Sequence, residues 1–448
     1  MTKQEQIQAV VGSLWRHPNF RRLWISDTIS QFGGQFSGWA IPTIAAYVLG
    51  ASPLELGILG AMAVIAWPIF ALPVGVWIDQ NRKRPIMVTA NIGRAIALAM
   101  VPLTWVLGTN TFFKIPVLDF NLFNIYTLYI VSFVVGLLTI FFDISYQSLL
   151  PSIVDNAQLV EGNSKLQISQ SAAQVFGPTI STTAIQLITV PASPLACIGD
   201  AVGFSASAFF LRKIDKEEPV PKDHTGRPSF LNQIREGLMV VVRDSTLRSI
   251  AASGATFNLF NNAIGVLILV FARDVLKLVP STAVGAFGIA ASIGSIGGLI
   301  GALYAARLAK RLGVGPTIII SQFTGTLGFL FLALDTPALA APIIGLFSPF
   351  LIIFFFLVSL GGVIYNVNQV SLRQSLVPLK LQGRMNASIR WIIWGTIPIG
   401  SFSGGVLAQT LGVREAITIC ALGALLAGVW LLLGPVRHLR TMPNAEEV

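Results

Sequence analysis

Long apolar segments recur along the whole chain, and they constrain its fold more than any other feature. Each is close to the roughly 20 residues that an α-helix needs to cross a bilayer. A backbone inside lipid must satisfy its own hydrogen bonds, which a helix does. The pattern predicts an all-α membrane protein with twelve transmembrane helices. We place them at residues 24–48, 56–78, 86–107, 125–150, 168–188, 195–211, 250–271, 284–309, 318–334, 344–376, 389–411 and 416–433.

The basic residues predict the orientation of these helices, because Lys and Arg collect in cytoplasmic loops. With a cytoplasmic N-terminus, 24 of the 30 Lys and Arg residues, Arg373 among them, fall in predicted cytoplasmic segments and 4 fall outside. The remaining two, Arg94 and Arg390, lie within predicted helices. We therefore expect a multi-pass protein of a bacterial cytoplasmic (inner) membrane with both termini in the cytoplasm. This topology accounts for the net charge of +10 without a nucleic-acid partner.

Two short motifs show that the chain consists of related halves. The residues QSLLP at 147–151 return as QSLVP at 374–378, which is 227 positions later. The same offset relates Gln31 and Gln35 to Asn258 and Asn262. We predict six-helix bundles at residues 1–213 and 247–448. Residues 214–246 form a polar linker in which we expect an amphipathic helix.

The arrangement resembles the major facilitator superfamily. The stretch GVWIDQNRKR at 75–84 is similar to the signature of that family after its second helix. The stretches at 159–178, 271–276 and 381–400 resemble the branch that contains macrolide-efflux proteins and the enterobactin exporter. The resemblance implies transport by alternating access. It also implies a cytoplasmic gate, for which the candidates are Gly75, Asp79, Arg82, Lys83, Arg84 and Arg390.

Paired polar residues at membrane depth are candidates for a substrate cavity. Each pair is spaced i, i+4, so its members share one face of a helix. The resemblance implies that the four helices involved line the central cavity, whereas hydrogen bonding that only holds helices together is the alternative. Trp391 and Trp394 are candidates for aromatic walls, or they pack the eleventh helix. The cavity candidates are Gln31, Gln35, Gln147, Asn258, Asn262, Tyr365, Gln369, Trp391 and Trp394.

Three intramembrane carboxylates are candidates for proton coupling, since charged groups in membrane helices commonly mark proton or ion pathways. Asp143 is the first candidate, and an ion pair with the basic run at 82–84 is its alternative. Asp27 and Asp200 follow, with an interfacial position or a partner within the bundle as their alternatives.

Motifs typical of enzymes are missing from the sequence. The three histidines lie in predicted cytoplasmic segments, no paired metal-ligand spacing occurs, and no GxxxxGK phosphate loop is present. Cys197 and Cys420 fall within predicted helices. We therefore expect a monomeric secondary transporter, without cofactor or metal, that exports an amphiphilic small molecule such as a drug, macrolide or siderophore in exchange for protons. An uncoupled facilitator or importer is one alternative. A ligand sensor with a transporter fold is another.

Overall fold

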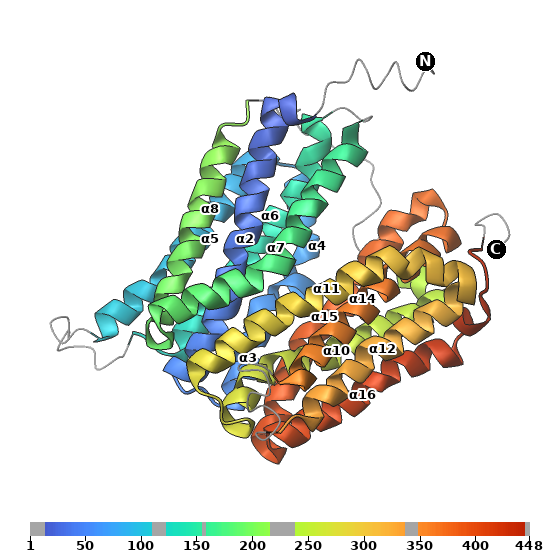
Figure 1. Ribbon diagram of the computed structural model, residues 1–448. Helices are drawn as coiled ribbons and strands as arrows, with labels where there is room; N and C mark the ends of the chain where they lie inside the picture. Colours follow the sequence, from blue (N-terminus) through green and yellow to red (C-terminus); the bar gives the residue numbers. More distant parts are fainter. Residues whose placement is uncertain (1–13, 110–121, 155–157, 216–237, 337–347, 444–448) are drawn as a thin grey trace. The chain divides into compact units, whose positions relative to one another are not determined.

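The protein is helical throughout the part that the structure describes, which comprises residues 14–109, 122–154, 158–215, 238–336 and 348–443 of a computed structural model (Figure 1). No strand occurs among these residues. The predicted linker helix falls largely within residues 216–237, which lie outside the described residues.

The first six transmembrane helices begin and end close to the positions expected from the apolar runs. A 3₁₀ turn, η1 (Leu14–Arg16), of which Leu14 is buried, precedes them, and a second, η5 (Val190–Leu195), comes before the last. The helices are α2 (Pro18–Thr43) with its π-helical end η2 (Ile44–Val48), α3 (Pro53–Val64) followed by α4 (Ala66–Asp79), α5 (Lys83–Thr109), α6 (Ile125–Ile153), α7 (Leu159–Ile188) and α8 (Ala196–Arg212).

The second six helices repeat this order. They are α10 (Ser245–Val270) with its π-helical end η6 (Phe271–Val275), α11 (Pro280–Leu312), α12 (Val314–Leu334), α14 (Pro349–Leu376), α15 (Leu379–Leu411) and α16 (Val413–Leu433), followed by a 3₁₀ turn, η7 (Pro435–His438). Ten segments of the described chain are long and apolar enough to cross a membrane. The long helices α2 and α7, which carry more polar residues, are not among them. Counting α3 and α4 as one broken helix, the described residues form twelve long helices, in agreement with the twelve apolar runs.

The offset of 227 residues is present in the helix boundaries. The pair α2 and α10 begins and ends at positions 227 apart, as do the π-helices η2 and η6 and the first residues of α3 and α11, which are both prolines. Even the residues that cap the first helix of each half, His17 and Asp244, correspond, and each accepts a hydrogen bond from the backbone three residues later. A side-chain acceptor at this position satisfies one of the free N–H groups of the first turn.

Contacts divide the chain into two compact units. Unit 1 consists of Met1–Ile44 and Ile69–His224, and unit 2 of Ala45–Pro68 and Thr225–Val448. In unit 1, α2 packs against α7 and α8, and α5 packs against α6 and α8. The corresponding helices of unit 2 pack in the same pairs, α10 against α15 and α16, and α12 against α14 and α16. The predicted division at residues 213 and 247 stays a prediction.

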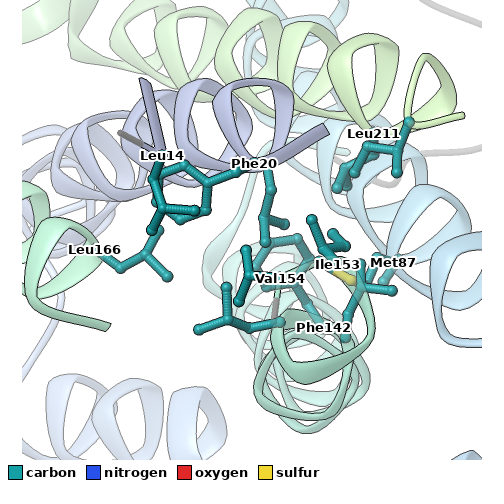
Figure 2. Packing of buried hydrophobic residues seen from close by; sticks show 13 residues of the cluster. Leu14, Phe20, Met87, Phe142, Ile153, Val154, Leu166 and Leu211 are labelled. Carbon is teal, nitrogen blue, oxygen red and sulfur yellow. The ribbon is translucent and has the colours of Figure 1, made fainter. Parts of the chain in front are cut away.

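A buried apolar cluster joins the elements at one end of unit 1. Leu14 and Phe20 from the start of the chain belong to one cluster with side chains of α5, α6, α7 and α8, and Figure 2 shows them together with Phe142, Ile153 and Leu166. Van der Waals packing of such side chains is what holds helices together in a membrane. The cluster therefore fixes the ends of five helices, and the polar groups on those helices are held in a defined arrangement.

Candidate functional site

A buried arginine is the centre of the polar groups in unit 1. Arg94 of α5 is 3% exposed, and its guanidinium lies 4.4 Å from the ring centroid of Phe142 and 4.2 Å from that of Phe204. One guanidinium nitrogen donates to Asn91 Oδ1 and another to Thr139 Oγ1 at 3.5 Å. The Nε atom has no hydrogen-bond partner among the described residues. The arginine is held by two aromatic faces from α6 and α8.

All three carboxylates proposed for proton coupling interact electrostatically with Arg94. Asp27 of α2 is 2% exposed and accepts a hydrogen bond from Gln31 Nε2 at 3.4 Å, whereas its depth in the membrane stays a prediction. Asp200 of α8 is fully buried, and its Oδ2 accepts from the backbone N–H of Ser37 at 2.8 Å. Its Oδ1 has no hydrogen-bond partner within the described part of the chain. Helices α2, α6 and α8 thus bring Asp27, Asp143 and Asp200 around a single cation.

Small polar residues extend this cluster, and the search for intramembrane charges missed them. Asn91 Nδ2 donates to Ser207 Oγ at 2.8 Å, and that hydroxyl lies 2.7 Å from Ser26 Oγ. Ser26, Asn91 and Ser207 are all fully buried. Polar residues within apolar helices were the available signal, but Ser is so common in membrane helices that the sequence does not single these out.

The other polar candidates of unit 1 are placed less centrally. Gln35 of α2 packs directly on α7, because a β-carbon added to Gly177 would lie 2.3 Å from Gln35 Cγ. Gln147 lies in α6, but its side chain is outside the described part of the structure. The structure therefore brings Gln31, and not Gln35, to the charged cluster.

The four polar candidates of α10 and α14 bond within unit 2. Asn258 donates to the carbonyl of Ile393 at 3.2 Å, whereas Asn262 donates to the carbonyl of Asn258 at 2.8 Å. Tyr365 donates to the carbonyl of Ile250 at 3.5 Å. Gln369, which is 5% exposed, donates to Asn366 Oδ1 at 3.0 Å.

Of these bonds, those of Asn258 and Tyr365 join two helices, which is the alternative expected for polar residues that hold a bundle together. Gln369 differs, because its Oε1 has no hydrogen-bond partner among the described residues.

The tryptophans of α15 lie against the first turn of α4. Trp391 Nε1 donates to the carbonyl of Pro68 at 3.0 Å. The ring of Trp394 meets that of Trp67 edge to face with centroids 4.6 Å apart, and the guanidinium of Arg390 lies 5.1 Å from the Trp394 centroid. These contacts lie within unit 2, to which Ala45–Pro68 belongs.

An apolar cavity of about 490 Å³ adjoins these rings in unit 2. It is lined by α3 and the residues that follow it on one side and by α15 on the other. Its walls include Ile58, Met62, Ile65, Pro398, Ile399 and Phe402. The side chains of Ile399 and Phe402 are about half exposed, so the cavity is open at its edge. Such a space suits a hydrocarbon group.

Arg373, which the sequence places in a cytoplasmic segment, lies in the last turn of α14 and is 9% exposed. Its cytoplasmic position stays a prediction.

The residues predicted to form a gate lie at the end of α4 and the start of α5. Gly75 has open space where a β-carbon would stand. Arg82 is exposed, Lys83 begins α5, and Arg84 donates to the carbonyl of Ile214. Asp79 ends α4, but its side chain is outside what the structure describes. The gate therefore stays a prediction.

Among the described residues, no cluster of three or more His, Cys, Asp or Glu side chains could hold a metal ion. Cys197 and Cys420 are buried free thiols. The chemistry that the described site residues offer is hydrogen bonding, charge and apolar contact.

Comparison with known proteins agrees with this fold. The family model of the Major Facilitator Superfamily matches residues 23–334 and 281–447. The chain is 26% identical over 421 residues to YfiS of Bacillus subtilis (strain 168), an uncharacterized MFS-type transporter, and the match covers 92% of each chain.

Solved structures show the same fold at low sequence identity. A bacterial homologue of the iron transporter ferroportin matches with a TM-score of 0.69 and 18% identity, over 94% of this chain and 99% of the other. The nucleoside transporter NupG matches with a TM-score of 0.67 and 14% identity, over 92% and 97%. These are families of transporters rather than enzymes. With its helical repeats, its apolar spans and a family match along nearly its whole length, the chain belongs to the Major Facilitator Superfamily of membrane transporters.

Proposed function

We propose that the protein is a secondary active transporter that exports an amphiphilic organic small molecule by alternating access, in exchange for protons. The observation that carries the proposal is the group of Asp27, Asp143 and Asp200 around Arg94 in the membrane helices of unit 1. Ionised, three carboxylates and one guanidinium carry an excess of two negative charges. Proton binding would neutralise that excess, and proton release would restore it. The protonation of the group can therefore change with the proton concentration on the side of the membrane to which it is open.

The repeat of two six-helix halves supports alternating access, because transporters built from structural repeats move one repeat against the other. The resemblance to the macrolide-efflux and enterobactin-exporter branch supports export and an organic cargo. The bacterial inner membrane, the cytoplasmic termini and the monomeric state belong to the same proposal. Asp79 and the basic residues that follow it are the proposed gate, and Asp79→Asn is expected to slow transport without changing cargo affinity.

Transport in inverted membrane vesicles tests the proposal. Vesicles that contain the protein and an acidic lumen are expected to accumulate a fluorescent amphiphilic dye faster than vesicles without it. Asp143→Asn, or the triple change to Asn at Asp27, Asp143 and Asp200, should abolish the dependence on the pH gradient.

Two other outcomes would contradict the proposal. Dye uptake by the unaltered protein that does not depend on the pH gradient would indicate a facilitator. Dye binding without flux would indicate a sensor. The exposed acidic residue Glu161, which pairs with Lys165 at the start of α7, provides the control variant Glu161→Gln.

A further inference from the structure

Asn91 of α5 joins Arg94 to polar groups on two neighbouring helices. Its Oδ1 accepts a hydrogen bond from Arg94 Nη2, and its Nδ2 donates to Ser207 Oγ of α8 at 2.8 Å. Ser207 Oγ lies 2.7 Å from Ser26 Oγ of α2, and Ser26 Oγ donates to the carbonyl of Ser207 at 3.1 Å. A chain of hydrogen bonds therefore runs from Arg94 through Asn91 to the helix that carries Asp27.

The hydrogens of this chain fit one arrangement. A guanidinium has donors only, so the atom of Asn91 that faces Arg94 is the oxygen, and the nitrogen faces Ser207. Because the single hydrogen of Ser26 Oγ goes to the carbonyl of Ser207, the hydrogen of Ser207 Oγ is the one between the two hydroxyls. The amide of Asn91 is thereby held with its oxygen toward Arg94.

The other contacts of Arg94 fix its guanidinium less firmly. The rings of Phe142 and Phe204, with centroids at 4.4 and 4.2 Å, restrain its plane but not its rotation within that plane. Thr139 Oγ1 accepts at 3.5 Å, which is long for a hydrogen bond, and Nε has no partner among the described residues. Asn91 is therefore the nearer of the two hydrogen-bond acceptors that the described residues offer to Arg94.

An uncharged acceptor leaves the whole charge of Arg94 to the carboxylates. The titratable groups in this cluster are Asp27 of α2, Asp143 and Tyr146 of α6, and Asp200 and Cys197 of α8. Helix α7, which also packs on α2, carries only two charged residues, and these pair with each other in its first turns. Asn91→Asp would therefore add a competitor for the one cation of the cluster.

The second half of the chain forms the same helix pairs without such a cluster. Helix α12 packs on α14 and α16 as α5 packs on α6 and α8. The sequence of α12 contains no charged residue, and α10, which corresponds to α2, contains no Asp or Glu between Ser245 and Val270. Packing of a half does not require an arginine surrounded by carboxylates, which favours a functional role for Arg94 and its partners.

We infer that Asn91 is a positioning residue of the proposed proton-coupling group. Its amide oxygen holds the guanidinium of Arg94 among the three carboxylates, and its lack of charge sets the pH range in which they exchange protons. Asn91 acts through Arg94 and binds neither a proton nor the cargo. The inference rests on the proposed function only in taking these protons to be the ones that drive transport.

Infrared titration of the purified protein tests this role, because the carbonyl band of a protonated carboxyl group disappears when the group ionises. Single changes of each aspartate to Asn assign the bands of the three carboxylates. Asn91→Asp is expected to raise the pH at which these bands disappear by about 1–3 units, since the added carboxylate takes the charge of Arg94 from them. The control Asn163→Asp adds the same charge at an exposed position of α7 and should leave that pH unchanged.

Ser207→Ala is the second variant, and it changes no charge. It removes the acceptor of Asn91 Nδ2, so the amide is no longer held toward Arg94, and a smaller rise of the same midpoint is expected. Alanine favours a helix, so this variant should fold even if Asn91→Asp does not, and its midpoint then decides. Unchanged midpoints in both variants, or an equal shift in Asn163→Asp and Asn91→Asp, would overturn the inference.

Dye uptake by vesicles separates this inference from the proposed function. A pH profile of uptake that shifts in Asn91→Asp together with the infrared bands would support both. Shifted bands in a protein that transports no dye would reject the proposed function but keep the role of Asn91. Uptake driven by the pH gradient, with the same pH profile in the unaltered protein and in Asn91→Asp, would keep the proposed function but reject that role.

Discussion

Gly57 of α3 and Gly405 of α15 bring the backbones of their helices into direct contact. A β-carbon on Gly405 would lie 2.9 Å from Gly57 Cα and 2.8 Å from the carbonyl oxygen of Pro53. Both neighbours are backbone atoms, so a change of side-chain rotamer cannot relieve the clash. Small residues at a crossing allow two membrane helices to approach this closely.

We expect Gly405→Ala to destabilise the protein by about 1–3 kcal/mol, the range for overpacking a filled site. Gly265→Ala in α10 is the control, because a β-carbon there meets nothing within 4 Å. It should leave stability unchanged or raise it, since Ala favours a helix over Gly by up to about 1 kcal/mol. The melting temperatures of the two variants in detergent should therefore move in different directions. A shift of the same sign in both would contradict the close crossing.

Gly177→Ala is expected to destabilise unit 1 through Gln35. The new β-carbon would stand 2.3 Å from Gln35 Cγ and 2.8 Å from its Cδ. Gln35→Ala removes both atoms, so the double variant should be more stable than the sum of the single changes predicts. Thermal unfolding of the four proteins measures this coupling. Additive effects would show that Gln35 does not fill this space.

Replacing Arg94 with Gln is expected to destabilise the protein by about 3–5 kcal/mol, because it leaves buried carboxylates without their cation. Arg94→Lys should also be destabilising, since a lysine does not present a flat face to Phe142 and Phe204. Arg82→Gln at an exposed position is the control. Unfolding in detergent at one pH measures all three. If Arg94→Gln has the same melting temperature as Arg82→Gln, the charge of Arg94 does not stabilise the cluster.

Asp335, just after α12, makes stability depend on pH. Burial raises the pKa of its carboxyl above the ordinary value of 3.8, although Arg414 and hydrogen bonds oppose the rise. The folded state then holds a proton that the unfolded chain releases, so stability falls as the pH rises above about 4 and through the raised pKa.

Asp335→Asn should remove this fall and be more stable than the unaltered protein at neutral pH. Melting temperatures measured from pH 4 to 8 check the prediction, with Glu415→Gln as the control. An unaltered slope in Asp335→Asn would place the titrating group elsewhere.

The apolar runs and the repeat predicted most of the helices because both are local properties of the sequence. The break between α3 and α4 was not predicted, although its cause is a single residue. A proline cannot donate its backbone N–H, and its ring clashes with the carbonyl four residues earlier. For Pro68 that residue is Val64, at which α3 ends. Pro73 in the same run lies inside unbroken α4, so the sequence did not show which proline would end a helix.

The candidate site was only partly predictable. Each aspartate and Arg94 stood out singly as a charge within an apolar run. Their meeting depends on how α2, α5, α6 and α8 pack, and on the rings of Phe142 and Phe204, which look like ordinary core residues in the sequence. Arg373 stands beside the polar end of its helix, and only packing shows that its side chain is buried.

The π-helical turns η2 and η6 lie at equivalent places in the two halves. Such turns are rare and are frequent at functional sites. Both occupy the same five positions of their halves, 227 residues apart. The two halves therefore correspond in the winding of their backbone as well as in the order of their helices, and this correspondence holds where their amino acids differ.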